Sequence, residues 1–292
     1  MGPLFESLIE IIRRTSAEIP DDVQRAILAA LENEKQDTIA KNAMEIIERN
    51  IALAKEKSQP LCQDTGSVLF YVDCPVGNDQ MEFADTARAA VTEATKRGFL
   101  RQNSVDSLTG KNDGTNIGPG APTFHFHQTR EANVTVRLVL KGGGCENVGA
   151  QYSLPNTQLN ANRDLDGCRK VILDAVQQAQ GKGCGPGILG VCIGGDRATG
   201  YDFSKTQFLR DLDDRNDHAE LDSLEQDILT TANKLGIGPM GFGGQTTLLG
   251  VKVTAANRLP ASFFVSVSYM CWAFRRHGAT LGSDGEIEEW LY

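Results

Sequence analysis

Apolar side chains recur at helical spacing through the first 58 residues. One apolar stripe runs from Phe5 to Ile12, and Pro20-Asp21-Asp22 then supplies a stop and an N-cap. The same period resumes from Val23 to Leu31 and again from Ala43 to Leu53. The pattern predicts a helical N-terminal part over residues 1–58, with a packing role.

Beyond residue 58, short apolar runs alternate with longer amphipathic segments. The runs predict strands over 67–73, 123–128, 133–140, 188–193, 248–255 and 263–270, the last two completing the ordered part. The amphipathic segments predict helices over 81–99, 166–180 and 218–235. This alternation indicates an α/β or mixed α+β protein, in which mixed sheets flanked by helices follow the helical N-terminal part. No repeat or low-complexity linker interrupts the chain, so we expect a single domain over residues 1–292.

Glycine-rich segments mark the loops. Asn103–Pro122 is expected to be a long polar loop. Lys141-Gly142-Gly143-Gly144 is expected to end a strand and open a loop, where the glycines either bring backbone N–H groups close to an anion or form a turn with positive φ. The run matches neither a Walker A motif nor a dinucleotide fingerprint. For Gly241–Gly244 we favour a structural role.

Composition and charge narrow the class of function. The 292 residues carry a formal net charge of −9 and no Lys/Arg run, which argues against a nucleic-acid-binding surface. Local cations must therefore hold any anionic substrate. No signal-peptide pattern or membrane-length apolar run is visible, so we expect no membrane contact and a cytoplasmic protein.

The seven cysteines are odd in number and widely scattered, which is not a disulfide framework. No Cys-x-x-Cys pair is present, so a zinc ribbon or a ferredoxin-type loop is not expected. Cys62 and Cys184 precede predicted strands, and Cys271 ends one. Three thiolates at strand ends could hold a cubane cluster and leave one iron open as a Lewis acid. The alternative is three buried cysteines without a common purpose.

Pro60-Leu61-Cys62-Gln63-Asp64-Thr65-Gly66 places a thiol, an amide, a carboxylate and a hydroxyl in succession ahead of a strand. The thiol could bind metal and the carboxylate could move protons. The same residues are also good turn formers, so both interpretations stay open at this point.

Other candidate residues give weaker signals. Arg101 could bind a carboxylate bidentately or could be a solvated charge. His125 and His127 would share one face of a strand, but no third metal ligand is visible. His218 and His277 are expected at the surface, and at least one member of the Arg275-Arg276 pair is expected to be structural.

Several segments together carry a family resemblance. They are the heptapeptide Pro60–Gly66, Asn103-Ser104-Val105, Leu108–Asn112, Leu140–Asn147, Val148–Pro155, Ile237-Gly238-Pro239 and Tyr269–Ala273. Over nearly its whole length the chain resembles the α subunit of the two-subunit class I fumarases, and the related α subunit of L-tartrate dehydratase. Lys-Gly-Gly-Gly-Cys-Glu-Asn-Val and Tyr-Ser-Leu-Pro resemble the fumarase branch more closely.

The resemblance implies a 4Fe–4S cluster held by Cys62, Cys184 and Cys271. Cys145 stands where related fumarases can carry Ser, so it is excluded as a ligand. The open iron would bind the substrate's hydroxyl and a neighbouring carboxylate.

The resemblance also implies that Gln63, Asp64, Arg101 and the backbone of Gly143 and Gly144 lie near the bound dicarboxylate. Asp64 would hydrogen-bond the substrate or pass a proton. The proton-abstracting residue would come from a separate β subunit, in an α–β hetero-oligomer.

The chain departs from the family pattern at one position. Relatives commonly carry Arg-His-Pro where this chain has Asn257-Arg258-Leu259-Pro260, and that histidine lies near the substrate in them. Leu259 can neither donate a hydrogen bond nor titrate. The leading hypothesis is a hydro-lyase subunit that interconverts fumarate and L-malate. The alternatives are a dehydratase for another hydroxy-dicarboxylate such as L-tartrate, and a weakened or non-catalytic cluster-binding subunit.

Overall fold

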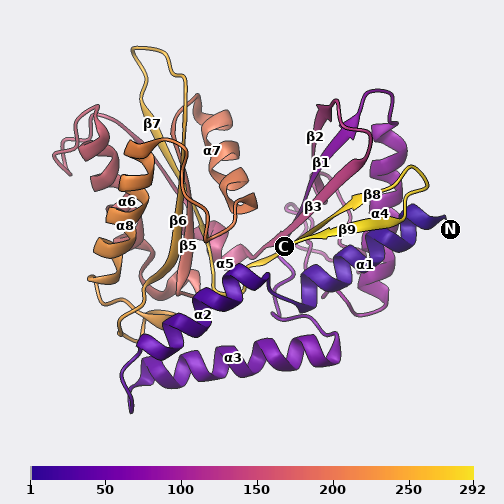
Figure 1. Cartoon of the computed structure of the whole chain (residues 1–292), viewed down its shortest axis with the longest axis horizontal. Helices are drawn as coiled ribbons and strands as arrows, with labels where there is room; N and C mark the ends of the chain where they lie inside the picture. Colours follow the sequence, from indigo (N-terminus) through magenta and orange to yellow (C-terminus); the bar gives the residue numbers. More distant parts are fainter. Residues whose placement is uncertain (1) are drawn as a thin grey trace. The chain divides into compact units, whose positions relative to one another are not determined.

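The computed structural model describes residues 2–292, and the contacts among them divide the chain into two compact units (Figure 1). The first unit combines the residues up to Asp21 with Arg49–Gly143 and Ala273–Tyr292. The second combines Asp22–Glu48 with Gly144–Trp272. That the two units act as one domain stays a prediction.

Three helices open the chain and confirm its predicted helical N-terminal part. They are α1 (Pro3–Ala17), α2 (Asp21–Asn33) and α3 (Ile39–Lys57). Pro3 lies in the first turn of α1, where a missing N–H costs nothing. The apolar residues from Phe5 to Ile12 lie on the buried side of this helix, as their spacing predicts.

The first unit is built on a five-stranded sheet in the order β2-β1-β3-β8-β9. Its strands are β1 (Ser67–Pro75), β2 (Thr123–Thr129), β3 (Val134–Lys141), β8 (Arg275–Leu281) and β9 (Ile287–Leu291). Strands β1 and β2 run parallel, and the other neighbours are antiparallel. Helix α4 (Gln80–Lys96) packs against α1, and its N-cap Asp79 accepts hydrogen bonds from two backbone N–H groups.

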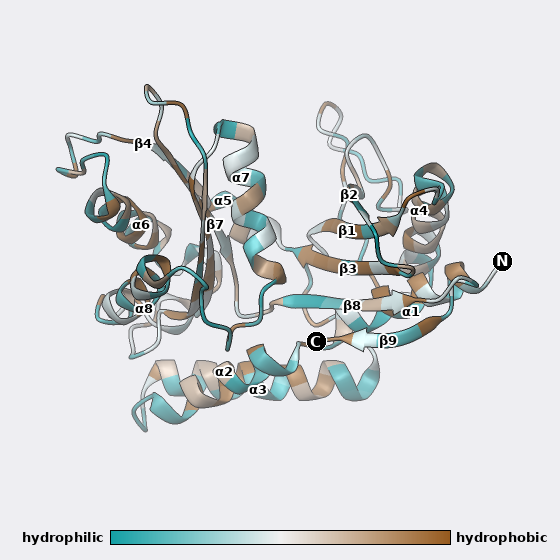
Figure 2. Ribbon diagram, turned by 45° about the horizontal axis from the view of Figure 1, so that its top comes forward, coloured by the Kyte–Doolittle hydropathy of each residue, from teal (hydrophilic) through white to brown (hydrophobic). Residues whose placement is uncertain are grey.

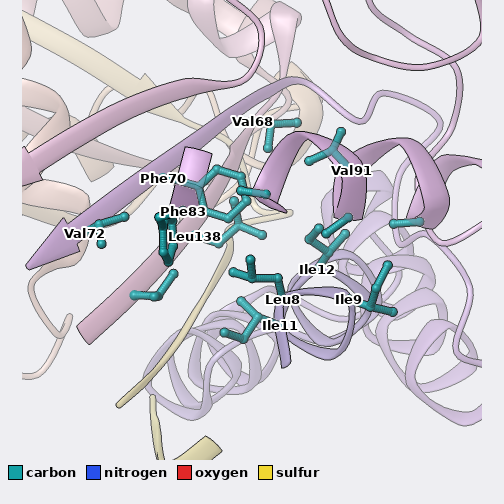
Figure 3. Packing of buried hydrophobic residues seen from close by; sticks show 14 of the residues in the cluster. Leu8, Ile9, Ile11, Ile12, Val68, Phe70, Val72, Phe83, Val91 and Leu138 are labelled. Carbon is teal, nitrogen blue, oxygen red and sulfur yellow. The ribbon is translucent and has the colours of Figure 1, made fainter. Parts of the chain in front are cut away.

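The core of this unit lies where α1 and α4 meet the sheet. Figure 3 shows Leu8 and Ile12 of α1 and Val91 of α4 directed toward Phe70 and Leu138 of the strands. These side chains are completely buried. The packed sheet fixes the ends of β1 and β3, and Asp64 and Gly143 lie just beyond those ends.

The second unit is built on a four-stranded sheet in the order β4-β7-β5-β6. Its strands are β4 (Ala150–Ser153), β5 (Gly187–Gly194), β6 (Leu248–Ala256) and β7 (Phe264–Met270). Besides α2 and the first part of α3, its helices are α5 (Gly143–Asn147), α6 (Leu165–Ala179), α7 (Arg197–Thr206) and α8 (Ala219–Asn233), with short 3-10 helices η1 (Gln180–Gly183), η2 (Gln207–Leu209) and η3 (Pro239–Gly241). In Figure 1, α6 and α8 cover one face of this sheet and α7 covers the other.

The mixed α/β class with helix-flanked sheets is confirmed, and every predicted strand and helix is present within a few residues of its expected bounds. Besides the three short 3-10 helices, five elements were missed: α5, β4, α7, β8 and β9. The prediction that two strands complete the ordered part is wrong, because β8 and β9 follow them. Figure 2 shows long hydrophobic stretches on β1 and β3. Strand β8 instead begins with the polar residues Arg275-Arg276-His277, so its sequence does not indicate that it is buried.

Burial corrects one expectation about the side chains of β8. His277 was expected at the surface, but it is 2% exposed, and Arg275 and Arg276 are both buried beside it in β8. The structure also corrects the expectation for two glycines. Gly143-Gly144 opens the short helix α5 rather than a loop, and neither residue has positive φ. Among residues 2–292, no helix is both long enough and apolar enough to cross a membrane.

Candidate functional site

The Asp64 carboxylate is the centre of a hydrogen-bonded site in the first unit. Its Oδ1 accepts from the Gly66 N–H at 2.8 Å and from the Asn103 side-chain amide, and its Oδ2 accepts from the Gly143 N–H at 2.7 Å. Donors on both oxygens hold the carboxylate in one orientation. The Asp64 carboxylate and the Gly143 backbone therefore lie together in this unit, and their contact with a substrate stays a prediction.

The heptapeptide is both a turn and a site. Gly66 has a φ of +76°, and a Cβ on it would lie 2.3 Å from the carbonyl oxygen of Lys141. Only glycine allows this close approach to the end of β3. The Asp64-to-Gly66 contact is an Asx turn, so the turn itself aims the carboxylate at Gly143.

Cys62 lies next to this carboxylate and is half-buried. The Asp64 N–H lies 3.5 Å from Cys62 Sγ and donates to it. Arg275 Nη1 donates to the Asp64 carbonyl oxygen at 2.7 Å, which fixes the backbone just after the cysteine. Gln63 is exposed on the same short segment.

A hollow of about 240 Å³ opens beside Asp64 in the first unit. Asp64, Asn103 and Gly143 line it together with Ser104, Asn116 and Thr123. Arg101 is not among its lining residues. Its side chain is exposed, while its backbone exchanges hydrogen bonds with the Thr65 hydroxyl at 2.8 and 2.9 Å. A substrate-binding role for the Arg101 guanidinium stays a prediction.

The sequence interpretation missed two functional candidates, the side chains of Asn103 and Asn116. Asn103 contacts Asp64, and Asn116 is buried behind the loop that carries Asn103. Both lie in the polar segment 103–122, where asparagine is common enough to carry no distinct signal. Asn103 stood within a family anchor, but its amide was not given a role.

In the second unit, Cys184 and Cys271 lie at one end of the four-stranded sheet. Cys184 follows η1 with a left-handed φ of 54°, and Cys271 directly follows β7. The Trp272 N–H donates to the Cys184 carbonyl oxygen at 3.3 Å, so the two cysteine segments touch through their backbones. A Cβ on Gly144 would lie 3.9 Å from the Lys182 carbonyl, which places Gly144 near the segment before Cys184.

Tyr269 fills the space behind these cysteines. Burial raises the pKa of its phenol, and the nearby thiols of Cys271, Cys145 and Cys184 raise it further. The glycines around Cys184 make room for the ring, since a Cβ on Gly183 or Gly187 would lie 2.5 or 2.2 Å from ring carbons. The Gly-Cys-Gly-Pro-Gly pattern is therefore a packing requirement of Tyr269.

The other cysteines differ in their surroundings. Burial raises the pKa of the Cys168 thiol to about 12 and that of Cys192 to about 11, which keeps both protonated and inert. Cys145 is buried in α5 and contributes to the surroundings of Tyr269, so proximity alone does not separate it from Cys184 and Cys271.

Cysteine is the usual ligand of an iron–sulfur cluster, so the residue type of each predicted ligand suits one. Cys62 receives a backbone N–H, and hydrogen bonds of this kind stabilise thiolate sulfur in such clusters. In the described part of the chain, no group of three or more His, Cys, Asp or Glu side chains is arranged to hold a single metal ion. His125, for which no third metal ligand was visible in the sequence, stacks on Tyr71 with ring centroids 4.5 Å apart.

Leu259 lies away from the cysteine end of the second unit. It precedes β7 and is 74% exposed, whereas Cys271 follows that strand. A strand rises about 3.3 Å per residue, so β7 alone separates the two positions by roughly 20 Å. Within this unit, the leucine therefore does not contact the segment that carries Cys184 and Cys271.

Comparison with known proteins gives the chain its relatives. Residues 5–280 match the model of the family described as fumarate hydratase (Fumerase). A protein of Geobacillus stearothermophilus, provisionally named a class I fumarate hydratase, is 53% identical over an alignment of 297 positions, which covers 100% of this chain and 58% of that protein.

Two further relatives are named as tartrate dehydratase subunits. A protein of Methanocaldococcus jannaschii, provisionally named L(+)-tartrate dehydratase subunit alpha, is 31% identical over 97% of this chain and 99% of its own length. The L(+)-tartrate dehydratase subunit alpha of Escherichia coli K12 is 28% identical over 99% of this chain and 94% of its own length. The chain thus spans little more than half of the Geobacillus relative and almost all of the other two.

Proposed function

Because the chain belongs to the fumarate hydratase family, we propose that it is the α subunit of a hydro-lyase that interconverts fumarate and L-malate. The proposal includes a 4Fe–4S cluster with Cys62, Cys184 and Cys271 as its protein ligands. The single observation that carries it is the oriented Asp64 carboxylate. Two residues after Cys62, it faces a hollow in which the Gly143 N–H holds one of its oxygens.

The protein groups have distinct tasks in this reaction. When bound, the cluster would supply a Lewis acid that helps a hydroxyl leave as water. Asp64 accepts a hydrogen bond from the substrate hydroxyl or passes a proton to it. Its orientation is already set by Gly66, Asn103 and Gly143, so little reorganisation accompanies the reaction. Gln63, Arg101 and Gly144 are proposed as further contacts to the dicarboxylate.

A separate β subunit completes the proposed site. Relatives named subunit alpha match this chain over almost their whole length, and the Geobacillus relative is longer than this chain. We propose that the partner supplies the group that abstracts the substrate proton, in an α–β hetero-oligomer located in the cytoplasm. Robust hydratase turnover by the purified α chain alone would contradict this division of the site.

The decisive experiment uses the co-expressed α–β complex after anaerobic reconstitution. We expect reversible turnover of fumarate and L-malate, and loss of most of that turnover in an Asp64→Asn variant, because an amide cannot accept or pass the proton in the same way. The matched control is Asp106→Asn, an exposed carboxylate that caps a turn in the same unit. Equal activity of the Asp64→Asn and unsubstituted complexes would contradict the proposed site.

L-Tartrate is the substrate of a second candidate function. The observation that favours it is the almost complete match to the two tartrate dehydratase relatives, against 58% coverage of the class I fumarate hydratase relative. The class I fumarate hydratase relative is more similar in sequence, at 53% identity against 31% and 28%, and this favours fumarate. Measuring kcat/KM of the assembled complex for L-malate and L-tartrate separates the two, since the preferred substrate has the larger value.

A further inference from the structure

One side chain in the described part of the chain donates to the Asp64 carboxylate, and it is the amide of Asn103. The remaining donors, at Gly66 and Gly143, are backbone N–H groups. Backbone donors follow from the path of the chain, but the Asn103 contact depends on the residue type. We call residues 101–117, which include the first part of the polar segment 103–122, the polar loop. The Asn103 contact is therefore the one through which this loop restrains the Asp64 side chain.

Asn116 holds the backbone of that loop in place. Its Oδ1 accepts from the Asn103 N–H at 2.8 Å and the Ser104 N–H at 2.9 Å, and its Nδ2 donates to the Arg101 carbonyl at 2.8 Å and to the Thr95 hydroxyl at 3.0 Å. Asn116 is only 3% exposed, and its φ of 59° is a conformation that asparagine adopts more readily than most residues. The backbone of Asn103 is thus fixed on a buried support.

Thr65 ties the same loop to the heptapeptide. Its hydroxyl donates to the Arg101 carbonyl and accepts from the Arg101 N–H, directly beside Asp64 in sequence. The loop and the heptapeptide are therefore held to each other at two points, Thr65–Arg101 and Asp64–Asn103. Two attachments fix the approach of the Asn103 amide to Oδ1, which one flexible contact would not do.

The chemistry of the Asn103 side chain suits a site for a dianion. Asn103 and Asp64 line the same hollow. A cationic donor there would pair with the substrate's own carboxylates, whereas a neutral amide restrains Asp64 without adding a competing charge. The amide thus limits rotation of the Asp64 side chain while the substrate enters.

We propose that Asn103 is a positioning residue that holds the Asp64 carboxylate in its reactive orientation, and that the stretch 101–104, which Thr65 and Asn116 support, belongs to the site for this reason. The inference rests on the proposed function of Asp64. It assigns to Asn103 no direct contact with the reacting atoms.

Turnover by the assembled, reconstituted α–β complex provides the first test. Asn103→Leu keeps the side-chain size and removes the donor, so kcat for L-malate should fall about 10-fold to 100-fold, with KM changed much less, because a hydrogen bond to a charged group is lost. Asn103→Gln keeps the amide and should recover part of the lost kcat. The matched control is Asn112→Leu, an exposed asparagine of the same loop that does not line the hollow, and it should keep kcat within about twofold.

A second test does not depend on turnover. In the full α chain, NMR hydrogen exchange should show one Asn103 side-chain amide proton protected from solvent, and Asp64→Ala should remove that protection. An unprotected amide in the unsubstituted chain overturns the positioning role, and so does an Asn103→Leu complex with unchanged kcat. A protected amide in a complex that turns over neither malate, fumarate nor tartrate overturns the proposed function, and with it the role of Asn103, while the contact stands.

Discussion

Gly187 and Tyr269 are in such close contact that any side chain at position 187 would overlap the tyrosine ring. A Cβ built on Gly187 would lie 2.2 Å from Cζ and 2.3 Å from the hydroxyl oxygen of Tyr269. The tyrosine is 3% exposed on β7, so its ring is packed among other groups. The backbone just after Cys184 therefore depends on a glycine that carries no chemistry.

Gly187→Ala should lower the free energy of unfolding by about 1–3 kcal/mol, because an added methyl group forces a packed ring to move. We also expect the variant to take up less iron during anaerobic reconstitution, since the shift occurs next to Cys184. Urea unfolding and iron content per chain measure the two effects. Gly118→Ala is the control, because no atom lies within 4 Å of a Cβ there and its φ is not positive. Equal stability of the two variants would contradict the packing argument.

His277 should make the protein acid-sensitive. Burial, together with the nearby charges of Arg14 and Arg276, lowers its pKa from 6.5 to about 3. Between pH 6.5 and pH 3, His277 therefore binds a proton in the unfolded chain but not in the folded chain. The free energy of unfolding is thus highest above pH 6.5 and falls toward pH 3, by up to about 1.4 kcal/mol per pH unit.

Urea unfolding of His277→Leu measured between pH 7 and pH 4 should show a smaller loss of stability with acid than the unsubstituted chain. His218→Leu, at an exposed position before α8, provides the control and should keep the original pH dependence. A His277→Leu slope that matches the original would show that this imidazole does not couple folding to protons.

His277 and Asn103 show where the sequence was insufficient. Periodicity predicted the apolar strands and helices because their burial follows from residue type and spacing. Nothing local to Arg275-Arg276-His277 indicates that a strand bearing three polar side chains is buried, since this depends on its antiparallel pairing with β3, more than 130 positions earlier. The resemblance of the chain to the class I fumarase α subunit is confirmed by the family match.

The candidate site divides in the same way. Asp64 and Gly143 stood out because their residue types lie in distinctive motifs, and the structure joins them through a hydrogen bond. Asn103 and Asn116 act through the path of a loop that sequence reasoning treats as uniformly polar. Many loop asparagines adopt a positive φ like that of Asn116, so an asparagine in a loop does not by itself indicate a buried support.

Cys184 and Cys145 should respond differently to substitution, although both thiols contribute to the surroundings of Tyr269. Cys184→Ser should lose most of the cluster, because a serine oxygen is a poor substitute for a thiolate on iron. Cys145→Ser should keep about four irons per chain, since Cys145 is not a proposed ligand. Iron and sulfide analysis with absorption spectra after anaerobic reconstitution measures both. An intact, fully occupied cluster in Cys184→Ser would refute the ligand assignment.

Leu259→His tests whether the leucine marks a lost activity. The position is 74% exposed, so the substitution should change the free energy of unfolding by no more than about 0.5 kcal/mol. Because the length of β7 separates Leu259 from Cys271, we expect the unsubstituted complex to turn over substrate normally and Leu259→His to alter kcat/KM less than about threefold. Ser262→His, in the same loop, is the control for adding an imidazole there. An inactive unsubstituted complex that Leu259→His restores would instead support the non-catalytic alternative, because the missing imidazole would then account for the lost turnover.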